Sequence, residues 1–328
     1  MTAARTVSPR RSYSVAEVEA LAERYRTWHK WGEADERGAT NYVTPDRVKA
    51  AAGLVRSGQV FNLAIPFDRN GPQPSRTPRV NPQHLMYRHG GDILADWENL
   101  ATGTVSTDDG VYLALQSATQ WDAFCHVFYN GQTYNGHGPA SVTSAGAHHN
   151  SITETREHTA GRGVLLDFAR FYGVDYLEPG DAIQANDLAD CADAQGVEIG
   201  EGDFVLIRTG HMKRMRESGQ EHWGDYVAGP APGLGLSTCE YLVPRRIAAV
   251  ASDTWGLEVQ PVETFPEVRS PLHVVLLVNA GVLIGEIWDL DALAAACAAD
   301  GVYEFFLAAP PLTITGSVGS PLSPLAIR

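Results

Sequence analysis

The sequence has few cysteines, a deficit of basic residues and no long apolar run. Its four cysteines are far apart, at Cys125, Cys191, Cys239 and Cys297. Without a C-x-x-C pair, neither a redox motif nor a thiolate zinc site is indicated, and a reduced, cytoplasmic protein is the simpler interpretation. No stretch of eighteen apolar residues occurs, and no apolar segment follows the three arginines of residues 1–11. We therefore expect neither membrane spanning nor export.

The charge balance narrows the range of partners. Against 25 basic residues stand 39 acidic ones, which gives a formal net charge of -14. Such a surface disfavours nucleic acid and anionic membranes, so a small-molecule substrate is the partner we expect. The sequence contains neither G-x-G-x-x-G after a strand, nor G-x-x-x-x-G-K-[ST], nor a repeat of 20 to 50 residues. Nucleotide binding therefore has little support.

The apolar pattern predicts a mixed α/β protein. Its 328 residues allow two average domains or one large α/β domain. We treat residues 1–11 as a flexible tail and residues 12–328 as a single catalytic domain. Ser14 and Glu17 form a capping box, which predicts a helix over about 15–29. Thr44 as N-cap and Pro45 at the first helical position predict a second helix over 45–57.

Further along the chain, helices and strands alternate. Near-continuous apolar runs predict buried strands at 162–169, 203–210 and 247–252, with a helix at 184–195 between the first two. Ser237 and Glu240 predict a second capping box and a short helix that ends near Val243. Residues 272–286 predict a helix or a strand, a turn at 279–281, and a strand that ends at Glu286; we favour the helix. A last helix at 290–299 and a strand at 303–315 follow.

Two segments predict long loops. Residues 68–82 are rich in proline and glycine and lack periodicity. Loops of this length are usually lids or subunit contacts, so we expect this one, with His84 and His89, near a pocket or an interface. A solvated loop with two incidental histidines is the alternative. Residues 134–152 carry His137, His148 and His149; adjacent residues of an extended segment point to opposite faces, so at most one of the last two faces a given site.

Residues 116–126, Q-S-A-T-Q-W-D-A-F-C-H, gather polar groups directly after the apolar run 111–115. In an extended chain alternate side chains share a face. A continuing strand therefore predicts one shared face for Gln116, Ala118, Gln120 and Asp122. His126 follows four residues after Asp122. Two amides, a carboxylate and an imidazole, able to meet a metal or a polar substrate, thus lie at a strand's end, where function often resides.

The same segment resembles the signature H-x-G-T-H-x-D-x-P-x-H of the metal-dependent cyclase family. This family includes bacterial kynurenine formamidase, isatin hydrolase and a class of polyketide cyclases. Thr119, Asp122 and His126 match the signature, while Gln116 and Gln120 stand where the family has two metal-binding histidines. In addition, Ala118 and Phe124 replace its glycine and proline. The resemblance continues in order through Trp31-Gly32, 41–45, 163–167, Gly202-Asp203, 208–210, His273, Gly285-Glu286 and 316–321.

The resemblance implies a fold and a set of roles. The fold is the swivelling β/β/α arrangement, a compact mixed sheet flanked by helices. Asp122 is then a single or bridging metal ligand, His126 is the acid/base, and His273 and Glu286 are further ligands. Gln116 and Gln120 occupy the two altered ligand positions. A homodimer or homotetramer is implied as well, with the first helix and residues 68–82 as interface elements.

The two glutamines change the expected metal chemistry. An imidazole is a good donor to zinc and manganese, whereas an amide oxygen is harder and weaker. One metal held by Asp122, His273 and Glu286 suits manganese or zinc and leaves positions open for water. Such a metal would activate water and polarise a carbonyl.

Three functions follow as hypotheses. The first is a metal-dependent hydrolase of a small cyclic or aromatic amide, imide or lactone, with His126 moving a proton to the leaving nitrogen or oxygen. The second is a cyclase or lyase of secondary metabolism that uses Asp122 and His126 as an acid/base pair, with or without metal. The third is a non-catalytic small-molecule binding protein. Against the third stands the joint presence of Asp122, His126, His273 and Glu286.

Aromatic residues around the segment suggest how a substrate would be held. Small-molecule sites are mostly apolar with a few polar groups. We therefore expect substrate-binding roles for Trp121, Phe124, Phe128, Asp253 and Trp255.

Overall fold

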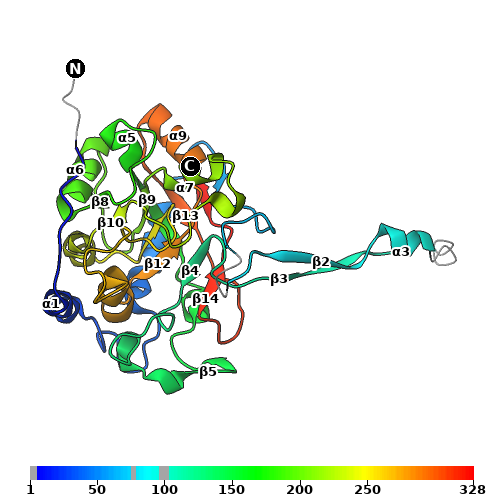
Figure 1. The fold of residues 1–328 in the computed structure, drawn as a ribbon, viewed down its shortest axis with the longest axis horizontal. Helices are drawn as coiled ribbons and strands as arrows, with labels where there is room; N and C mark the ends of the chain where they lie inside the picture. Colours follow the sequence, from blue (N-terminus) through cyan, green and yellow to red (C-terminus); the bar gives the residue numbers. More distant parts are fainter. Residues whose placement is uncertain (1–5, 75–78, 96–102) are drawn as a thin grey trace.

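The computed structural model describes residues 6–74, 79–95 and 103–328, and its body is built around one mixed sheet (Figure 1). In the described residues, nine strands form this sheet in the order β1-β15-β13-β7-β9-β11-β12-β4-β14. In that order the strands are Val60–Asn62, Leu325–Ile327, Glu304–Ala308, Ala160–Asp167, Phe204–Arg208, Ala249–Ser252, Leu283–Glu286, Gln120–Asp122 and Gly319–Pro321.

The centre of the sheet is parallel and its flanks are antiparallel. Strands β7, β9, β11 and β12 run parallel to one another, while β13 on one side and β4 on the other run against them. Strands β9, β11 and β12 are buried almost throughout, as their near-continuous apolar sequences require when helices cover both faces. Because Glu286 ends β12, its carboxylate lies at the carboxyl edge of the parallel strands, where α/β proteins commonly bind ligands.

Helices surround the sheet. The α-helices are α1 (Val15–Tyr25), α2 (Pro45–Ala52), α3 (Gly90–Ala95), α5 (Phe168–Tyr172), α6 (Ala185–Gln195), α7 (His211–Glu217), α8 (Cys239–Leu242) and α9 (Asp291–Asp300). A π-helix covers His273–Asn279. Short 3-10 turns lie at Gly38–Tyr42, Tyr134–Gly136, Pro139–Ser141, Ile152–Thr155, Glu221–Trp223, Leu236–Thr238 and Val243–Arg245. Among the described residues, none of the helices has the length and apolar character needed to cross a membrane.

Three pairs of strands lie outside the main sheet. They are β8 (Ala182–Ile183) with β10 (Gly233–Leu234), β5 (Val142–Thr143) with β6 (Gly146–Ala147), and β2 (Gln83–Arg88) with β3 (Asp108–Tyr112). The β2–β3 pair forms a ribbon that projects far from the body and carries α3 toward its outer end (Figure 1). Its apolar side chains Leu85, Tyr87 and Tyr112 are exposed to 49%, 72% and 65%.

Most of the expected elements are present, with shorter ends. The predicted strands correspond to β7, β9 and β11, and a helix does precede β12. Helix α1 ends at Tyr25 rather than near 29, because the chain then turns to the π-helix: the Thr27 N–H donates to the Asn279 carbonyl at 2.9 Å. Helix α2 likewise ends at Ala52 rather than 57, and β13 ends at Ala308 rather than 315.

Two local expectations were wrong. The run 111–115 does not lead into the central strand, since β3 belongs to the ribbon and β4 starts only at Gln120. A turn separates β3 from β4, and in it the Ser117 N–H donates a hydrogen bond to the Ala114 carbonyl at 2.9 Å. The second capping box is also absent, because the Ser237 hydroxyl donates to Gln184 Oε1 and α8 begins at Cys239.

The described part of the N-terminal segment lies along the body. The Ser8 hydroxyl donates to Asp187 Oδ1 at 2.8 Å, and the Arg11 N–H donates to Glu263 Oε1 at 2.8 Å. Residues 1–5 of the expected tail lie outside the described residues.

Candidate active site

Strands β4 and β12 bring the first three polar groups together. Gln120 and Asp122 alternate with Trp121, so they share one face while the indole points into the core and packs 4.7 Å from the ring of Trp288. The antiparallel register sets Gln120 opposite Glu286. The Gln120 Nε2 donates to Glu286 Oε2 at 2.9 Å. Strand pairing alone therefore fixes an amide and two carboxylates on one surface.

The π-helix supplies the imidazole. His273 begins this helix, and its Nε2 lies 3.5 Å from Asp122 Oδ2 and 3.5 Å from Glu286 Oε1. All three residues are buried. The π-helix is a rare conformation that occurs frequently at functional sites. Here its first residue brings a histidine between two carboxylates from different strands.

Glu258 fixes the orientation of this histidine. Its Oε1 accepts from both the backbone N–H and the Nδ1 of His273, at 2.9 Å and 2.8 Å. The Nε2 of the same ring is thereby directed at Asp122 and Glu286. A carboxylate that holds the far nitrogen of a histidine is the usual outer support of a metal-ligating imidazole.

The centre strongly favours positive charge. Burial opposes ionisation of His273, but the carboxylates of Glu258, Asp122 and Glu286 raise its pKa well above the ordinary value. Burial likewise opposes ionisation of Asp122, yet its pKa is lowered by His126 and His273. Three buried carboxylates thus surround one imidazolium, and they would stabilise a cation in the same place.

The donor atoms fit a divalent metal. One ligand atom from each of Asp122, His273 and Glu286 lies within 4.8 Å of the others. Ligands about 2.1 Å from a shared tetrahedral ion lie about 3.4 Å apart, which matches the two distances of 3.5 Å from His273 Nε2. Within the described part of the chain, Asp122 Oδ1 and Gln120 Oε1 are buried without a hydrogen-bond partner. Two unpartnered oxygens beside this set are what a ligand or substrate would satisfy.

His126 stands at the accessible side of the centre. The turn after β4 places it there, and in this turn the backbone N–H of His126 donates a hydrogen bond to the Ala123 carbonyl at 2.9 Å. Its Nε2 lies 3.6 Å from Asp122 Oδ1, and its side chain is 21% exposed, against 2% for Asp122. The expected acid/base histidine is therefore the group of this centre that solvent and substrate can reach.

The loop 68–82 reaches the same place. Arg79 Nη2 lies 3.4 Å from His126 Nε2, and its guanidinium carbon lies 5.9 Å from the centre of the Trp255 ring. We expected this loop, with His84 and His89, near a pocket or an interface, and its described part lies beside the buried centre. His84 and His89 lie instead on the ribbon, where they pair with Asp109 and Asp92.

Gln116 lies beside β14. Its Nε2 is buried and, among the described residues, has no hydrogen-bond partner. A Cβ atom on Gly319 would stand 2.4 Å from that nitrogen, so the close approach requires glycine. Gly319 pairs with Asp122 across β14 and β4. Gln116 therefore lies beside the strand pair that carries Asp122. Thr119, which also matches the signature, ties β4 to its neighbours through the Ile287 carbonyl and the Ile65 N–H.

A second apolar cluster adjoins the centre, and we call it the apolar wall. It contains Ile65, Ala118, Met212, Tyr226, Val227 and Ile287, with Phe67, Met215, Trp223 and Trp255 packed against it. Ala118 lies two residues before Gln120, and Ile287 directly follows Glu286. The wall thus includes chain neighbours of two residues of the polar set, and an apolar surface with a few polar groups is typical of a small-molecule site.

Unpartnered polar atoms lie against the wall. Both ring nitrogens of His211 and the Nε1 of Trp255 are buried without a hydrogen-bond partner in the described structure. His211 stacks on Tyr226 with ring centres 5.6 Å apart. Burial lowers the pKa of His211 to about 4, so this imidazole is neutral near pH 7.

The five expected substrate-binding residues are distributed differently. Trp121 and Phe124 are 0% and 1% exposed within the main core, and Phe128 is exposed. Asp253 accepts from the backbone N–H groups of Thr209 and Gly210, so it anchors the turn between β9 and α7. Burial raises its pKa to about 6. Of the five, the structure places Trp255 against the apolar wall.

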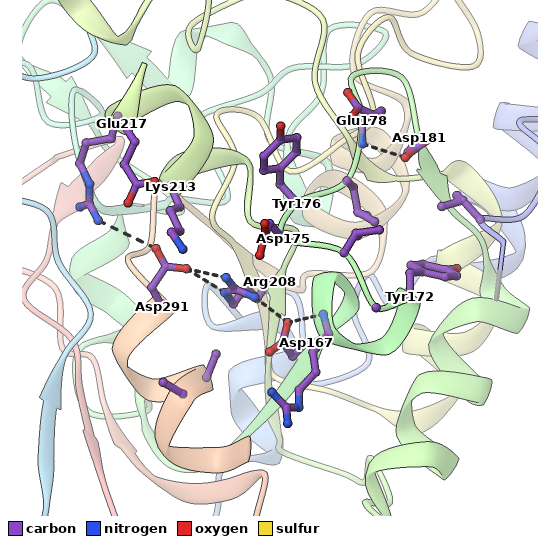
Figure 2. A pocket seen from close by; sticks show the side chains of 18 residues that line it. Asp167, Tyr172, Asp175, Tyr176, Glu178, Asp181, Arg208, Lys213, Glu217 and Asp291 are labelled. Carbon is purple, nitrogen blue, oxygen red and sulfur yellow. Dashed lines mark hydrogen bonds and ion pairs between the residues drawn. The ribbon is translucent and has the colours of Figure 1, made fainter. Parts of the chain in front are cut away.

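A large polar cavity lies elsewhere. Figure 2 shows this cavity of about 990 Å³, lined among others by Asp167, Arg208 and Asp291. Two of its arginines are held in ion pairs: Arg208 bonds Asp167 and Asp291 at 2.8 Å each, and Arg216 bonds Asp289 at 2.7 Å. These groups are held in ion pairs, so we assign the chemistry to the buried centre at Asp122.

Comparisons with known proteins agree with this fold. A sequence profile of the family described as "Putative cyclase" matches residues 61–259. A solved structure described as a novel cyclase is 40% identical, covers 93% of this chain and 100% of its own, and superposes with a TM-score of 0.86.

More distant solved structures share the fold. Isatin hydrolase A from Labrenzia aggregata, bound to benzyl benzoate, is 22% identical over 84% of this chain and 94% of its own, with a TM-score of 0.59. Isatin hydrolase A from Ralstonia solanacearum is 20% identical over 86% and 97%, with a TM-score of 0.60. A search of the curated proteins found no match. The profile match and the 40% identity show that this chain belongs to the cyclase family.

Proposed function

We propose that this protein is a metal-dependent hydrolase of a small cyclic or aromatic amide, imide or lactone. The observation that carries the proposal is the convergence of Asp122, His273 and Glu286 within 4.8 Å, with His126 at 3.6 Å from Asp122. The apolar wall beside this centre suits a small aromatic substrate. Isatin hydrolases share the fold, which supports the same class of substrate.

Asp122, Glu286 and the Nε2 of His273 would hold one divalent ion, manganese or zinc. Bound there, the metal would activate a water molecule and polarise the substrate carbonyl. Glu258 keeps a proton on His273 Nδ1, so that Nε2 is the nitrogen free to act as a ligand. Two carboxylates balance the charge of the ion in a site from which bulk water is largely excluded.

His126 moves the proton. Its Nε2 lies beyond hydrogen-bond distance from Asp122 Oδ1, at 3.6 Å, so Asp122 does not hold this nitrogen. The ring would take a proton from the attacking water and give it to the leaving nitrogen or oxygen. Arg79, at 3.4 Å from the same nitrogen, brings positive charge to the side where the carbonyl oxygen becomes negative.

The glutamines bind substrate in this proposal. Gln120 is held by its bond to Glu286, which leaves its Oε1 to accept an N–H from an amide or imide. The unpartnered Nε2 of Gln116 is a donor for a substrate oxygen. Both amides are buried, so a substrate that satisfies them is favoured over one that leaves them unpaired.

The same amides favour one second candidate, a cyclase or lyase. Without two imidazole ligands, Asp122 and His126 can act as a carboxylate and imidazole pair that transfers a proton during a cyclisation or elimination, with or without metal. A cyclisation by isomerisation leaves the mass of the substrate unchanged, and an elimination lowers it. Hydrolysis instead adds the mass of one water molecule. Product mass therefore separates the two candidates.

The test combines metal content with a substrate panel. Protein purified without a polyhistidine tag is analysed by elemental mass spectrometry and incubated with cyclic imides, aryl amides and lactones. We expect about one manganese or zinc per chain at this centre and hydrolysis that stops on chelation and returns with metal. Asp122→Asn should bind about one ion fewer per chain than the parent and lose hydrolysis, whereas Asp109→Asn on the ribbon should change neither. Protein that neither binds manganese or zinc nor hydrolyses any of the panel would contradict the proposal.

We also propose that the protein is a homodimer or homotetramer. The ribbon exposes Leu85, Tyr87 and Tyr112, and a two-stranded ribbon is marginally stable alone in water. A second copy of this chain would cover these side chains. Light scattering should show an oligomer that dissociates in Leu85→Glu/Tyr87→Glu but not in His84→Gln; an unchanged mass in the first variant would contradict a ribbon interface.

A further inference from the structure

A second group of metal-binding residues lies outside the active site. One ligand atom from each of Glu36, His137 and His149 lies within 4.8 Å of the others. Glu36 Oε1 is 2.7 Å from His149 Nδ1. The two imidazole rings stack with centres 4.2 Å apart and planes inclined by 9°. None of these residues takes part in the proposed hydrolysis.

Two buried asparagines fix the segments that carry this group. Asn135, two residues before His137, donates to the carbonyls of Gly32 and Asp35 at 3.2 Å and 2.9 Å. It therefore ties the chain next to Glu36 to the loop that carries His137. Asn135 has a φ of 61°, the left-handed conformation that asparagine adopts more readily than most residues.

Asn150 makes the matching connection for the other histidine. It directly follows His149, has a φ of 60° and is 0% exposed. Its Nδ2 donates to the Tyr134 carbonyl at 2.7 Å, and its backbone N–H donates to Glu36 Oε2 at 2.8 Å. The second bond orients the carboxylate, as outer partners orient the ligands of metal sites.

The surroundings leave the group open to an ion. Among the described residues, His137 Nε2 is buried without a hydrogen-bond partner. Glu36 lines a surface cavity of about 840 Å³ along residues 31–37, which provides an entry path. A hydrogen bond now joins His149 Nδ1 and Glu36 Oε1. A metal that replaced its proton would bind both of these atoms.

We propose that Glu36, His137 and His149 form a second divalent-metal site, of the two-histidine, one-carboxylate type that suits zinc. Two neutral imidazoles and one carboxylate are a common zinc donor set. The ion would connect residues 31–37 with both ends of the loop 134–150. Its role is to stabilise this loop, because binding to the folded chain alone raises stability by mass action.

The test uses zinc as the probe and a neighbouring histidine as the control. Protein stripped of metal is dialysed against zinc, and zinc per chain is measured by elemental mass spectrometry. We expect His149→Ala to bind about one zinc fewer than the parent, and Glu36→Gln, which keeps the side-chain shape, to show the same loss. His148 lines the same cavity but does not belong to the group. The His148→Ala variant should therefore bind as much zinc as the parent.

A second readout separates this site from the active site. In an Asp122→Asn background, zinc should still raise the Tm, and the rise should disappear in Asp122→Asn/His149→Ala. If the proposed hydrolysis fails, the comparison of His149→Ala with His148→Ala is unaffected. Equal zinc binding by these two variants, or complete loss of zinc in Asp122→Asn alone, would overturn the second site.

Discussion

The buried centre and the group at Glu36 use the same kinds of donor in opposite proportions. The buried centre has two carboxylates and one imidazole, from β4, β12 and the π-helix, with each residue at most 6% exposed. The Glu36 group has one carboxylate and two imidazoles on loops, and the side chain of His149 is 47% exposed. The first lies beside an apolar wall and His126, which is the proton carrier in the proposed mechanism.

In our proposals, this difference separates the reactive centre from the stabilising site. Charges interact more strongly where water is excluded, which is why the neighbouring carboxylates raise the pKa of His273 and the imidazoles of His126 and His273 lower that of Asp122. Strands also hold their side chains more precisely than loops do. Donor type alone therefore does not identify the active site; burial, rigid placement and an adjoining substrate surface do.

The largest expected effect is loss of activity in Asp122→Asn. The amide keeps the shape but removes a negative ligand and the group facing His126. We expect hydrolysis to fall on the order of 1,000-fold, measured as kcat/KM on the best substrate of the panel. Asp109→Asn, an exposed carboxylate paired with His84, is the control. Equal activity in both variants would remove the buried centre from the mechanism.

The effect of burial can be tested on His211. Its pKa is lowered to about 4 by burial, so in the window from about pH 6.5 down to 4 the unfolded chain takes up a proton that the folded chain refuses. The stability present above pH 6.5 is therefore lost as the pH falls, by up to about 3 kcal/mol. His211→Phe should show a smaller loss between pH 7 and 4 in urea unfolding. Parallel curves for the two proteins would show that His211 does not contribute.

Glu258→Gln tests the support behind the ligand. The amide retains an acceptor for His273 Nδ1 but lacks the charge that makes the ring a better donor. We expect metal affinity to fall about 10- to 100-fold, measured by competition with a chelator. The control is Glu221→Gln, because the Glu221 side chain is exposed. Glu263→Gln is unsuitable, because Glu263 accepts a hydrogen bond from the Leu236 N–H. An unchanged affinity in Glu258→Gln would show that its contact with His273 is only structural.

The smallest expected effect is a gain in bound zinc. In Gln116→His/Gln120→His the two imidazoles of the family signature return next to Asp122. We expect about one additional zinc per chain, with Asp122 as a shared ligand, and Gln59→His away from the site should add none. Zinc binding equal to that of the parent would show that more than two side chains separate this centre from a two-metal one.

Much of the architecture could be predicted from the sequence, and so could the convergence of Asp122, His273 and Glu286. The apolar runs predicted β7, β9 and β11 because buried parallel strands have few alternatives. The signature match predicted Asp122 and His126 for one centre, and the wider family resemblance added His273 and Glu286. The alternation rule also placed Trp121 opposite to Gln120 and Asp122, so its expected role in substrate binding disagreed with the pattern itself.

Other features had no local signal. The bond from His273 to Glu258 joins residues 15 positions apart and depends on where the π-helix begins. The contact of Arg79 with His126 spans 47 positions across a loop without periodicity. The projecting ribbon was missed because Val111 and Tyr112 have the composition of a buried strand, although both are exposed.

Anomalous scattering tests the central claim most directly. Crystals grown with manganese or zinc are measured on both sides of the absorption edge of that metal. The account predicts a peak between Asp122, His273 and Glu286, within ligand distance of His273 Nε2. Density for a well-ordered centre with no anomalous peak there, at metal concentrations that support hydrolysis, would contradict it.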